Sequence, residues 1–187
     1  MTTIARSAGA VSLGNQVVVG TVLTNAPLTF PPPFSVTPGT FGTTAVTVSG
    51  GQTRTLAPGS YGSVTVFSGG RLNLTSGVYR FASLDLEPQA ILGLAQASGP
   101  IQIQVQSSLI WRGTETLTSG SIAGFTLAYF GTAIAPFEQP FTGVLVAPNA
   151  QATLGTDTSV TFAGQFYVKT LVASPNTVIV CREDVLP

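Results

Sequence analysis

Histidine is absent from the 187 residues, and cysteine occurs once, at Cys181. Without histidine the chain lacks the Ser-His-Asp and Cys-His arrangements, the zinc-protease helix motif and the commonest general base at neutral pH. A single cysteine forms no internal disulfide, and we interpret Cys181 as a small packed side chain. We therefore expect no catalytic residues, no metal site and no cofactor, and a protein that is not an enzyme.

Charge is also scarce. Seven basic and seven acidic residues give a net charge of zero, and charged residues make up 7% of the chain. This balance excludes the basic surface that nucleic acids require. The longest early apolar stretch, residues 17–23, is far below the roughly 20 residues of a membrane span, and residues 1–6 lack the apolar core of a secretory signal. We expect no nucleic-acid partner, no membrane span and no export signal in the chain as given, so a cytoplasmic location stays open.

Threonine occurs 26 times and glycine 21 times, and 44% of the residues are apolar. This bias toward β-branched residues and turn formers is typical of an all-β protein. Apolar residues alternate with polar ones in short segments such as residues 64–66, 72–74 and 101–105. Glycine or proline interrupts these segments every five to ten residues, so the pattern predicts many short strands in one domain and no long helix.

The strands repeat along the chain. Residues 56–66 are echoed 18 positions later, which aligns Gly59 with Gly77 and Tyr61 with Tyr79, and residues 143–146 are echoed at 164–168. A period near 20 is typical of a parallel β-solenoid, in which each coil stacks on the next, and it predicts roughly eight coils. We expect Tyr61 to stack on Tyr79 and Gly59 on Gly77. Valine at either glycine should then destabilise the coil if the position needs positive φ.

The expected organisation has four parts. Residues 1–26 form a first coil or cap, residues 27–42 a proline-rich excursion, residues 43–181 the β-solenoid and residues 182–187 a C-terminal tail. Prolines at 31, 32, 33 and 38 exclude the excursion from an interior strand, because proline has no N–H to donate. Residues 113–120 have the composition of a polar loop.

The repeated motifs resemble those of β-solenoid domains in bacterial surface proteins, including domains associated with type IV pilus assembly. That family shows a Leu-x-Pro-Gly-x-Tyr-x-x-Val element, a Gly-x-Tyr-x-Phe-x-x-Leu element, a Gly-Pro-Ile strand and a paired ending with Ala-Pro-Asn-Ala and lysine. The matches here are residues 56–64, 77–84, 99–103, 143–150 and 164–171, so the resemblance covers about residues 44–181. It implies a β-solenoid at the cell surface or outside the cell, and it brings no catalytic residue set.

Two groups of side chains could form a carbohydrate site. Asp85 and Glu87 alternate across Leu86, and pectin-cleaving β-solenoid enzymes carry acid clusters on one face. Neighbouring coils supply no further acids, so we interpret the pair as a solvated strand face. The aromatic residues of the C-terminal half could stack on sugars, but their alternation with small residues favours interior ladders: Phe125, Tyr129, Phe130, Phe137, Phe141, Phe162, Phe166 and Tyr167.

These observations favour a structural or surface-assembly β-solenoid that associates with itself into an extended assembly or filament. So few charges would leave an isolated monomer poorly soluble, whereas burial of faces between copies removes that liability. Cell-surface components are a second class of partner, and a carbohydrate-binding or carbohydrate-active β-helix is the alternative function. The candidate assembly contacts are Phe30, Pro31, Pro32, Pro33, Phe34, Trp111 and Arg182.

Overall fold

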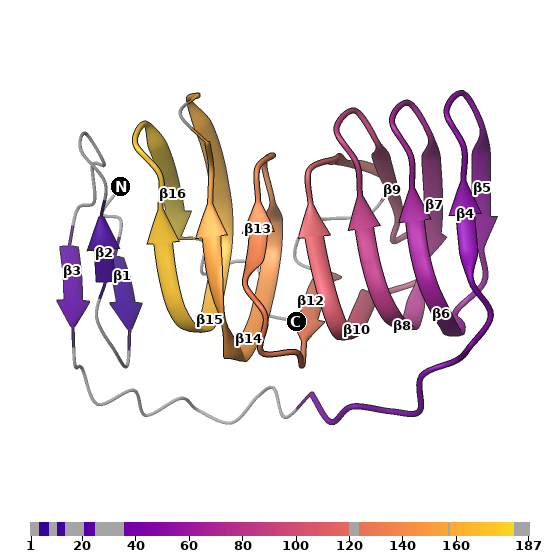
Figure 1. The fold of residues 1–187 in the computed structure, drawn as a ribbon, viewed down its shortest axis with the longest axis horizontal. Helices are drawn as coiled ribbons and strands as arrows, with labels where there is room; N and C mark the ends of the chain where they lie inside the picture. The colour runs from indigo at the N-terminus through magenta and orange to yellow at the C-terminus, as the bar shows by residue number, and fades with distance from the viewer. Residues whose placement is uncertain are drawn as a thin grey trace.

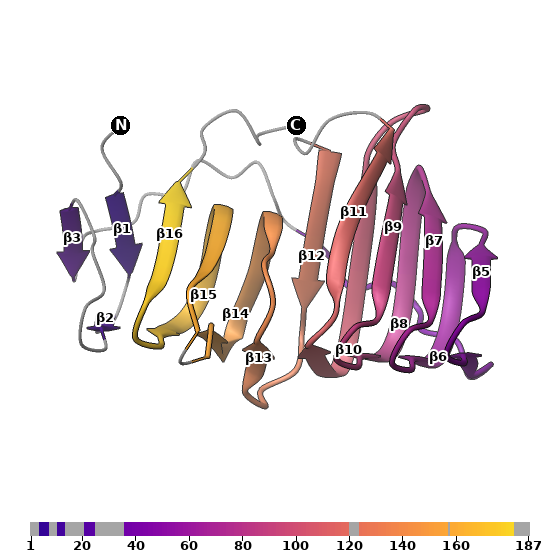
Figure 2. The same cartoon turned by 90° about the horizontal axis from the view of Figure 1, so that it is seen from above.

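A computed structural model describes residues 4–7, 11–13, 21–24, 36–119, 124–156 and 158–181. The described chain contains strands and turns and no α-helix, and its strands stack in parallel as a β-solenoid of about six turns. This confirms the predicted all-β solenoid. Figure 1 shows the strands side by side along the long axis of the molecule, and Figure 2 shows the second layer of strands behind them.

The larger sheet has ten strands, which pair in parallel. Its main order is β16-β15-β14-β12-β10-β8-β6-β4, with β13 between β10 and β14 and β2 beside β15. The strands are β2 (Val11–Leu13), β4 (Val46–Val48), β6 (Gly59–Val66), β8 (Gly77–Leu86), β10 (Ile101–Trp111), β12 (Phe125–Tyr129), β13 (Ala135–Phe137), β14 (Thr142–Leu154), β15 (Val160–Ala173) and β16 (Thr177–Cys181).

The smaller sheet has the order β11-β9-β7-β5 and is also parallel. Its strands are β5 (Thr53–Leu56), β7 (Arg71–Thr75), β9 (Ile91–Ala95) and β11 (Thr114–Ser119). Two further strands, β1 (Ile4–Ser7) and β3 (Thr21–Thr24), pair with each other in parallel. Both sheets advance together along the axis because the chain crosses from one to the other in each of these turns.

Strand β11 corrects the prediction of a polar loop at residues 113–120. Thr114 to Leu117 pair with Ile91 to Leu94 of β9, in register with the rest of the smaller sheet. The threonines that suggested a loop are β-branched and suit the outer surface of a strand. Polarity alone was therefore misleading here, because an end strand exposes more of its residues than a central one.

The number of turns is about six, so the prediction of roughly eight was wrong. It assumed a uniform period over the whole chain, but residues 36–45 form no strand and the step between turns varies: Val46 pairs with Val64 and Val64 with Leu84, whereas Leu84 pairs with Leu109. The last step is longer because the register shifts in β10 between Val105 and Ser108. A bulge of this kind consumes residues without adding a turn.

The first echo does not stack as predicted. Gly59 pairs with Tyr79 and Tyr61 with Phe81, a separation of 20 residues where the echo has 18. The two tyrosines instead share a local role, since the Tyr61 hydroxyl donates to the Ala57 carbonyl (2.7 Å) and the Tyr79 hydroxyl contacts the Thr75 carbonyl (3.0 Å). The motif thus specifies a corner within each turn. The second echo does stack, with Gly143 opposite Gly164.

The core is a set of interior ladders that run along the axis. One ladder joins Val48, Val66, Leu86, Trp111, Phe137, Leu154 and Ala173. In the backbone register Leu13 lies opposite Ala173. From Val48 to Ala173 each member is buried. The aromatic side chains Phe125, Tyr129, Phe137, Phe141 and Phe162 are also fully buried, which confirms their predicted use as interior residues, whereas the other three predicted interior rings are half-buried: Phe130, Phe166 and Tyr167.

Glycine is required at Gly77 and not at Gly59. Gly77 has φ of +139°, and a Cβ there would lie 2.4 Å from Cγ of Pro58, whereas at Gly59, outside the positive-φ range, the nearest contact is 3.6 Å away. We expect Gly77→Ala to lower the free energy of unfolding by about 1 kcal/mol or more. Urea denaturation beside the control Gly59→Ala measures this, and equal losses in both variants would contradict it.

Candidate assembly site

One end of the solenoid is formed by β4 and β5, the last strands of their sheets in the order of pairing. The Val48 carbonyl accepts from Phe67 N–H (2.9 Å), and the Thr44 carbonyl from Gly62 N–H (2.7 Å), so residues 44, 46 and 48 face β6. Because backbone groups alternate along a strand, the N–H and C=O of Thr47 point away from β6. Among the described strands none pairs with this outer edge of β4.

The same argument applies to β5. The Gln52 carbonyl accepts from Arg71 N–H (2.8 Å), so this carbonyl and the backbone groups of Arg54 face β7 and those of Thr53 and Thr55 face outward. The two edges differ in charge, since β5 carries the exposed Arg54 and β4, with the sequence Val-Thr-Val, carries none. A charge on an edge strand discourages pairing with another chain, so β4 is the more receptive edge.

At the opposite end the N-terminal segment completes the larger sheet. Strand β2 pairs in parallel with the second half of β15, and Val11, Ser12 and Leu13 lie opposite Leu171, Val172 and Ala173. The first half of β15 pairs with β16. Residues 1–26, expected as a first coil or cap, therefore place a strand at the C-terminal end of the solenoid, far along the axis from β4 (Figure 1).

The segment 36–45, which we call the axial segment, lies against the larger sheet. Gly39 N–H donates to Oε1 of Gln104 (3.2 Å), and the Ser60 hydroxyl donates to the Thr40 carbonyl (2.8 Å). The ring of Phe41 meets Phe130 edge-on at 6.3 Å. These contacts span β6 to the residue after β12, so the described part of the proline-rich excursion makes an intramolecular contact. Sequence reasoning had not singled out Gln104, because an outward-facing glutamine carries no distinguishing signal.

Of the predicted assembly contacts, Trp111 alone lies within the described residues. Trp111 is completely buried, and its ring packs on Phe137, Phe125 and Phe141 at centroid distances of 5.8, 6.4 and 5.5 Å. Its indole N–H donates to the Pro140 carbonyl (3.3 Å). The prediction of a surface contact at Trp111 is therefore wrong, because the last residue of β10 faces the interior ladder. The remaining predicted contacts lie outside the described residues: Phe30, Pro31, Pro32, Pro33, Phe34 and Arg182.

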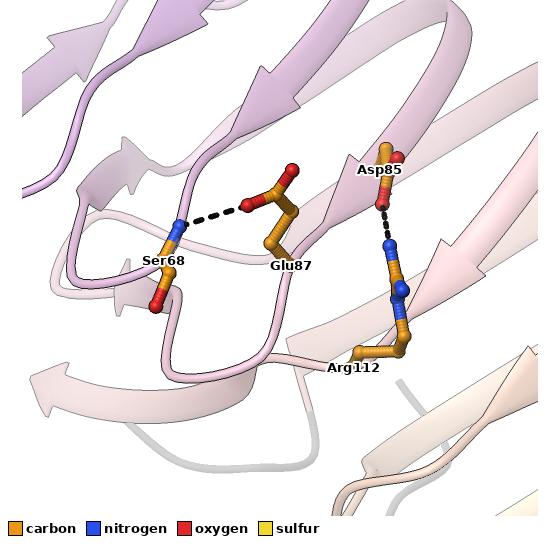
Figure 3. A network of polar contacts seen from close by, with 4 residues as sticks. All are labelled: Ser68, Asp85, Glu87 and Arg112. Atoms are coloured by element: carbon orange, nitrogen blue, oxygen red, sulfur yellow. Dashed lines mark hydrogen bonds and ion pairs between the residues drawn. The ribbon is translucent and has the colours of Figure 1, made fainter.

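The candidate acid pair is engaged in two separate contacts. Asp85 accepts from Nη2 of Arg112 at 3.3 Å, with both side chains about one-third exposed. Oε2 of Glu87, just beyond β8, accepts from Ser68 N–H at 3.2 Å. Figure 3 shows the Glu87 carboxylate directed to Ser68 and the Asp85 carboxylate to Arg112. The Asp85 carboxylate binds a residue at the end of a neighbouring strand, and the Glu87 carboxylate binds a residue in a turn. Both contacts join adjacent coils and are structural.

Glu115 is the most perturbed acid of the described chain. It occupies the position that follows Leu72 and Leu92 in an interior ladder of the smaller sheet. Its Oε1 accepts from Thr142 N–H, and its enclosed Oε2 has no hydrogen-bond partner. Burial raises the pKa of Glu115 from 4.5 to about 8, although the bond from Thr142 acts in the opposite direction. A buried carboxyl group of this kind is a cost to stability whenever it is charged.

Two open grooves line the surface. One, of about 790 Å³, lies beside the axial segment and is lined by residues 38–43 with Gly62, Ser63, Ala82 and Gln106. The other, of about 430 Å³, lies at the turns around Ser76, Gly99 and Pro100. The ring of Phe41, which lines the larger groove, is half-buried and packs edge-on against Phe130, and Phe67 is the one aromatic side chain in the described part that is largely exposed. Neither groove therefore has a largely exposed aromatic ring on which a sugar could stack.

Within the described ranges no group of three or more potential metal-ligating residues comes together. The described residues also include no helix with the length and apolarity to cross a membrane. Among the described residues, β4 and β5 have outward backbone groups with no strand beside them. Comparison of the chain with models of known protein families, with curated proteins and with solved structures found no match.

Proposed function

We propose that this protein is a structural β-solenoid that associates end to end into an extended assembly and has no enzymatic activity. The observation that carries the proposal is the outer edge of β4, where an uncharged strand of the larger sheet ends with outward backbone groups and no strand beside it among those described. Parallel edges of this kind act as templates for another strand. A head-to-tail contact between unlike ends produces an open filament when successive copies stack along the axis and do not close into a ring.

The low charge supports the same proposal. With seven charges of each sign, the surface has little electrostatic repulsion to keep copies apart. The resemblance to bacterial surface and pilus-associated domains supports a location at the cell surface, where cell-surface components would be further partners. The two engaged carboxylates, Asp85 and Glu87, favour a non-enzymatic role over carbohydrate cleavage.

Proline on the end strands tests the proposal. Thr47→Pro and Thr55→Pro together remove only N–H groups that point away from the sheets, so the chain keeps its own ladder bonds. We expect the wild-type chain to form extended particles at roughly tens of micromolar, a concentration that exceeds the affinity of transient contacts. The double variant should stay monomeric. Light scattering, sedimentation and negative-stain microscopy measure this.

The matched control is the double variant Thr47→Ala, Thr55→Ala, which shortens the same side chains and keeps both N–H groups. It should assemble as the wild type does, and circular dichroism should show the same fold in all three proteins. A wild-type chain that stays monomeric at this concentration would refute the proposal. Retardation of that monomer by a soluble polysaccharide in affinity electrophoresis would instead favour the carbohydrate-binding alternative.

A further inference from the structure

The N-terminal strand β2 is built as a rung of the larger sheet. In the backbone register Leu13 follows the positions that run from Val48 to Ala173 through every turn, although Leu13 precedes all the other members in the sequence. Ala173 would otherwise end this register in the described chain. Among the described strands the larger sheet therefore ends here on a strand that comes from the opposite end of the chain, while β3 of the two-stranded sheet lies farther out along the axis (Figure 1).

Strands β2 and β4 match each other in length and pattern. Both have three residues, with apolar residues on either side of a hydroxyl residue: Val11-Ser12-Leu13 and Val46-Thr47-Val48. They also occupy equivalent positions, since Leu13 and Val48 lie at the two ends of one series of backbone pairings, and Ser12 and Thr47 are the middle residues of the two end strands. A strand that fits beside one turn of this face has the pattern needed to fit beside another.

We propose that β4 of a second copy of this chain pairs in parallel with the outer edge of β2, aligning Val46, Thr47 and Val48 with Val11, Ser12 and Leu13. The proposal rests on the end-to-end assembly proposed above and names the two strands that form its joint. It would carry the parallel backbone pairing of the larger sheet from one copy into the next.

The backbone geometry is consistent with this joint. Each rung is parallel to its neighbour, so β2 and β4 of two stacked copies run in the same direction. The outward N–H and C=O groups of Thr47 face the approaching copy. They correspond to the N–H and C=O groups of Thr65, which face β4 within one chain. Neither strand carries a charged residue, so their approach desolvates no ionic group.

Contact between β2 and β4 can occur only between copies in the arrangement described. Seven strand spacings separate them through β6, β8, β10, β13, β14 and β15, and at 4.8 Å each the distance is roughly 34 Å. Figure 1 shows β2 and β4 toward opposite ends of the molecule. A covalent bond between the two strands would therefore report on the joint between two molecules.

Disulfide trapping tests the joint. In a Cys181→Ser background, Ser12→Cys and Thr47→Cys place one thiol on each strand, and opposite residues of neighbouring parallel strands are about 4.8 Å apart at Cα, within the range of a disulfide. Oxidation of the assembled protein should give a series of covalent dimers, trimers and longer chains on a non-reducing gel. The control pair Ser12→Cys with Thr55→Cys, which moves one thiol to the end strand of the other sheet, should give no such series.

The outcomes separate this inference from the proposed function. Assembled particles that give no covalent series, or give it equally in the control pair, would overturn the β2–β4 joint and leave end-to-end assembly standing. A disulfide within one chain would also overturn it, because β2 would then lie beside its own β4. A protein that remains monomeric before oxidation would refute both proposals.

Discussion

Replacing Trp111 with alanine should lower the free energy of unfolding by about 3–5 kcal/mol, a large part of the 5–15 kcal/mol that typically stabilises a domain. Trp111 is the largest fully buried side chain, and it contacts three phenylalanine rings from three later segments. Its removal leaves a cavity between β10 and β13 and an unpaired carbonyl at Pro140. Chemical denaturation measures the loss.

Phe67→Ala is the matched control, because Phe67 is an aromatic residue that is 42% exposed. Its loss should change the free energy of unfolding by less than about 1 kcal/mol, since little buried area disappears. Similar losses in the two variants would contradict the placement of Trp111 in the interior ladder. Retained stability in Trp111→Ala would restore the earlier expectation of a surface residue.

We expect the wild-type chain to lose stability between pH 4.5 and about pH 8, and we expect Glu115→Gln to abolish this loss. The raised pKa of Glu115 means that the folded chain keeps a proton which the unfolded chain releases above pH 4.5. Stability is therefore highest below pH 4.5, falls as the pH rises through this window, and levels off above pH 8. The total fall from this residue is on the order of a few kcal/mol, at about 1.4 kcal/mol per pH unit.

Urea denaturation at pH 4, 6, 8 and 9 measures the difference between the two proteins. Glutamine keeps the side-chain shape and an oxygen that can accept from Thr142 N–H, so the variant should exceed the wild type in stability at pH 8 to 9 and differ little at pH 4. Glu138→Gln, after β13, is the control. An unchanged pH dependence in Glu115→Gln would show that the Glu115 carboxyl group is hydrated.

The fold could be predicted from the sequence, but the exact stacking of its turns could not. Alternation and regular glycine turns predicted a parallel solenoid, because a two-residue period and a repeat near 20 residues leave few other arrangements. The echo of Tyr61 at Tyr79 was misaligned by two residues, since both tyrosines satisfy a local carbonyl four residues earlier. A local bond repeats in the sequence whether or not the turns are equally long.

Only the general nature of the candidate site, a surface for self-association, could be predicted from the sequence. Scarce charge indicated self-association, and charge is a property of composition alone. That β2 lies beside β15, that Trp111 faces the interior and that Glu115 is enclosed depend on which residues meet across 25 to 160 positions of chain. Sequence alone determined that strands form and stack, through short-range alternation. The tertiary structure decided which end each strand completes, because that choice is made by contacts between distant segments.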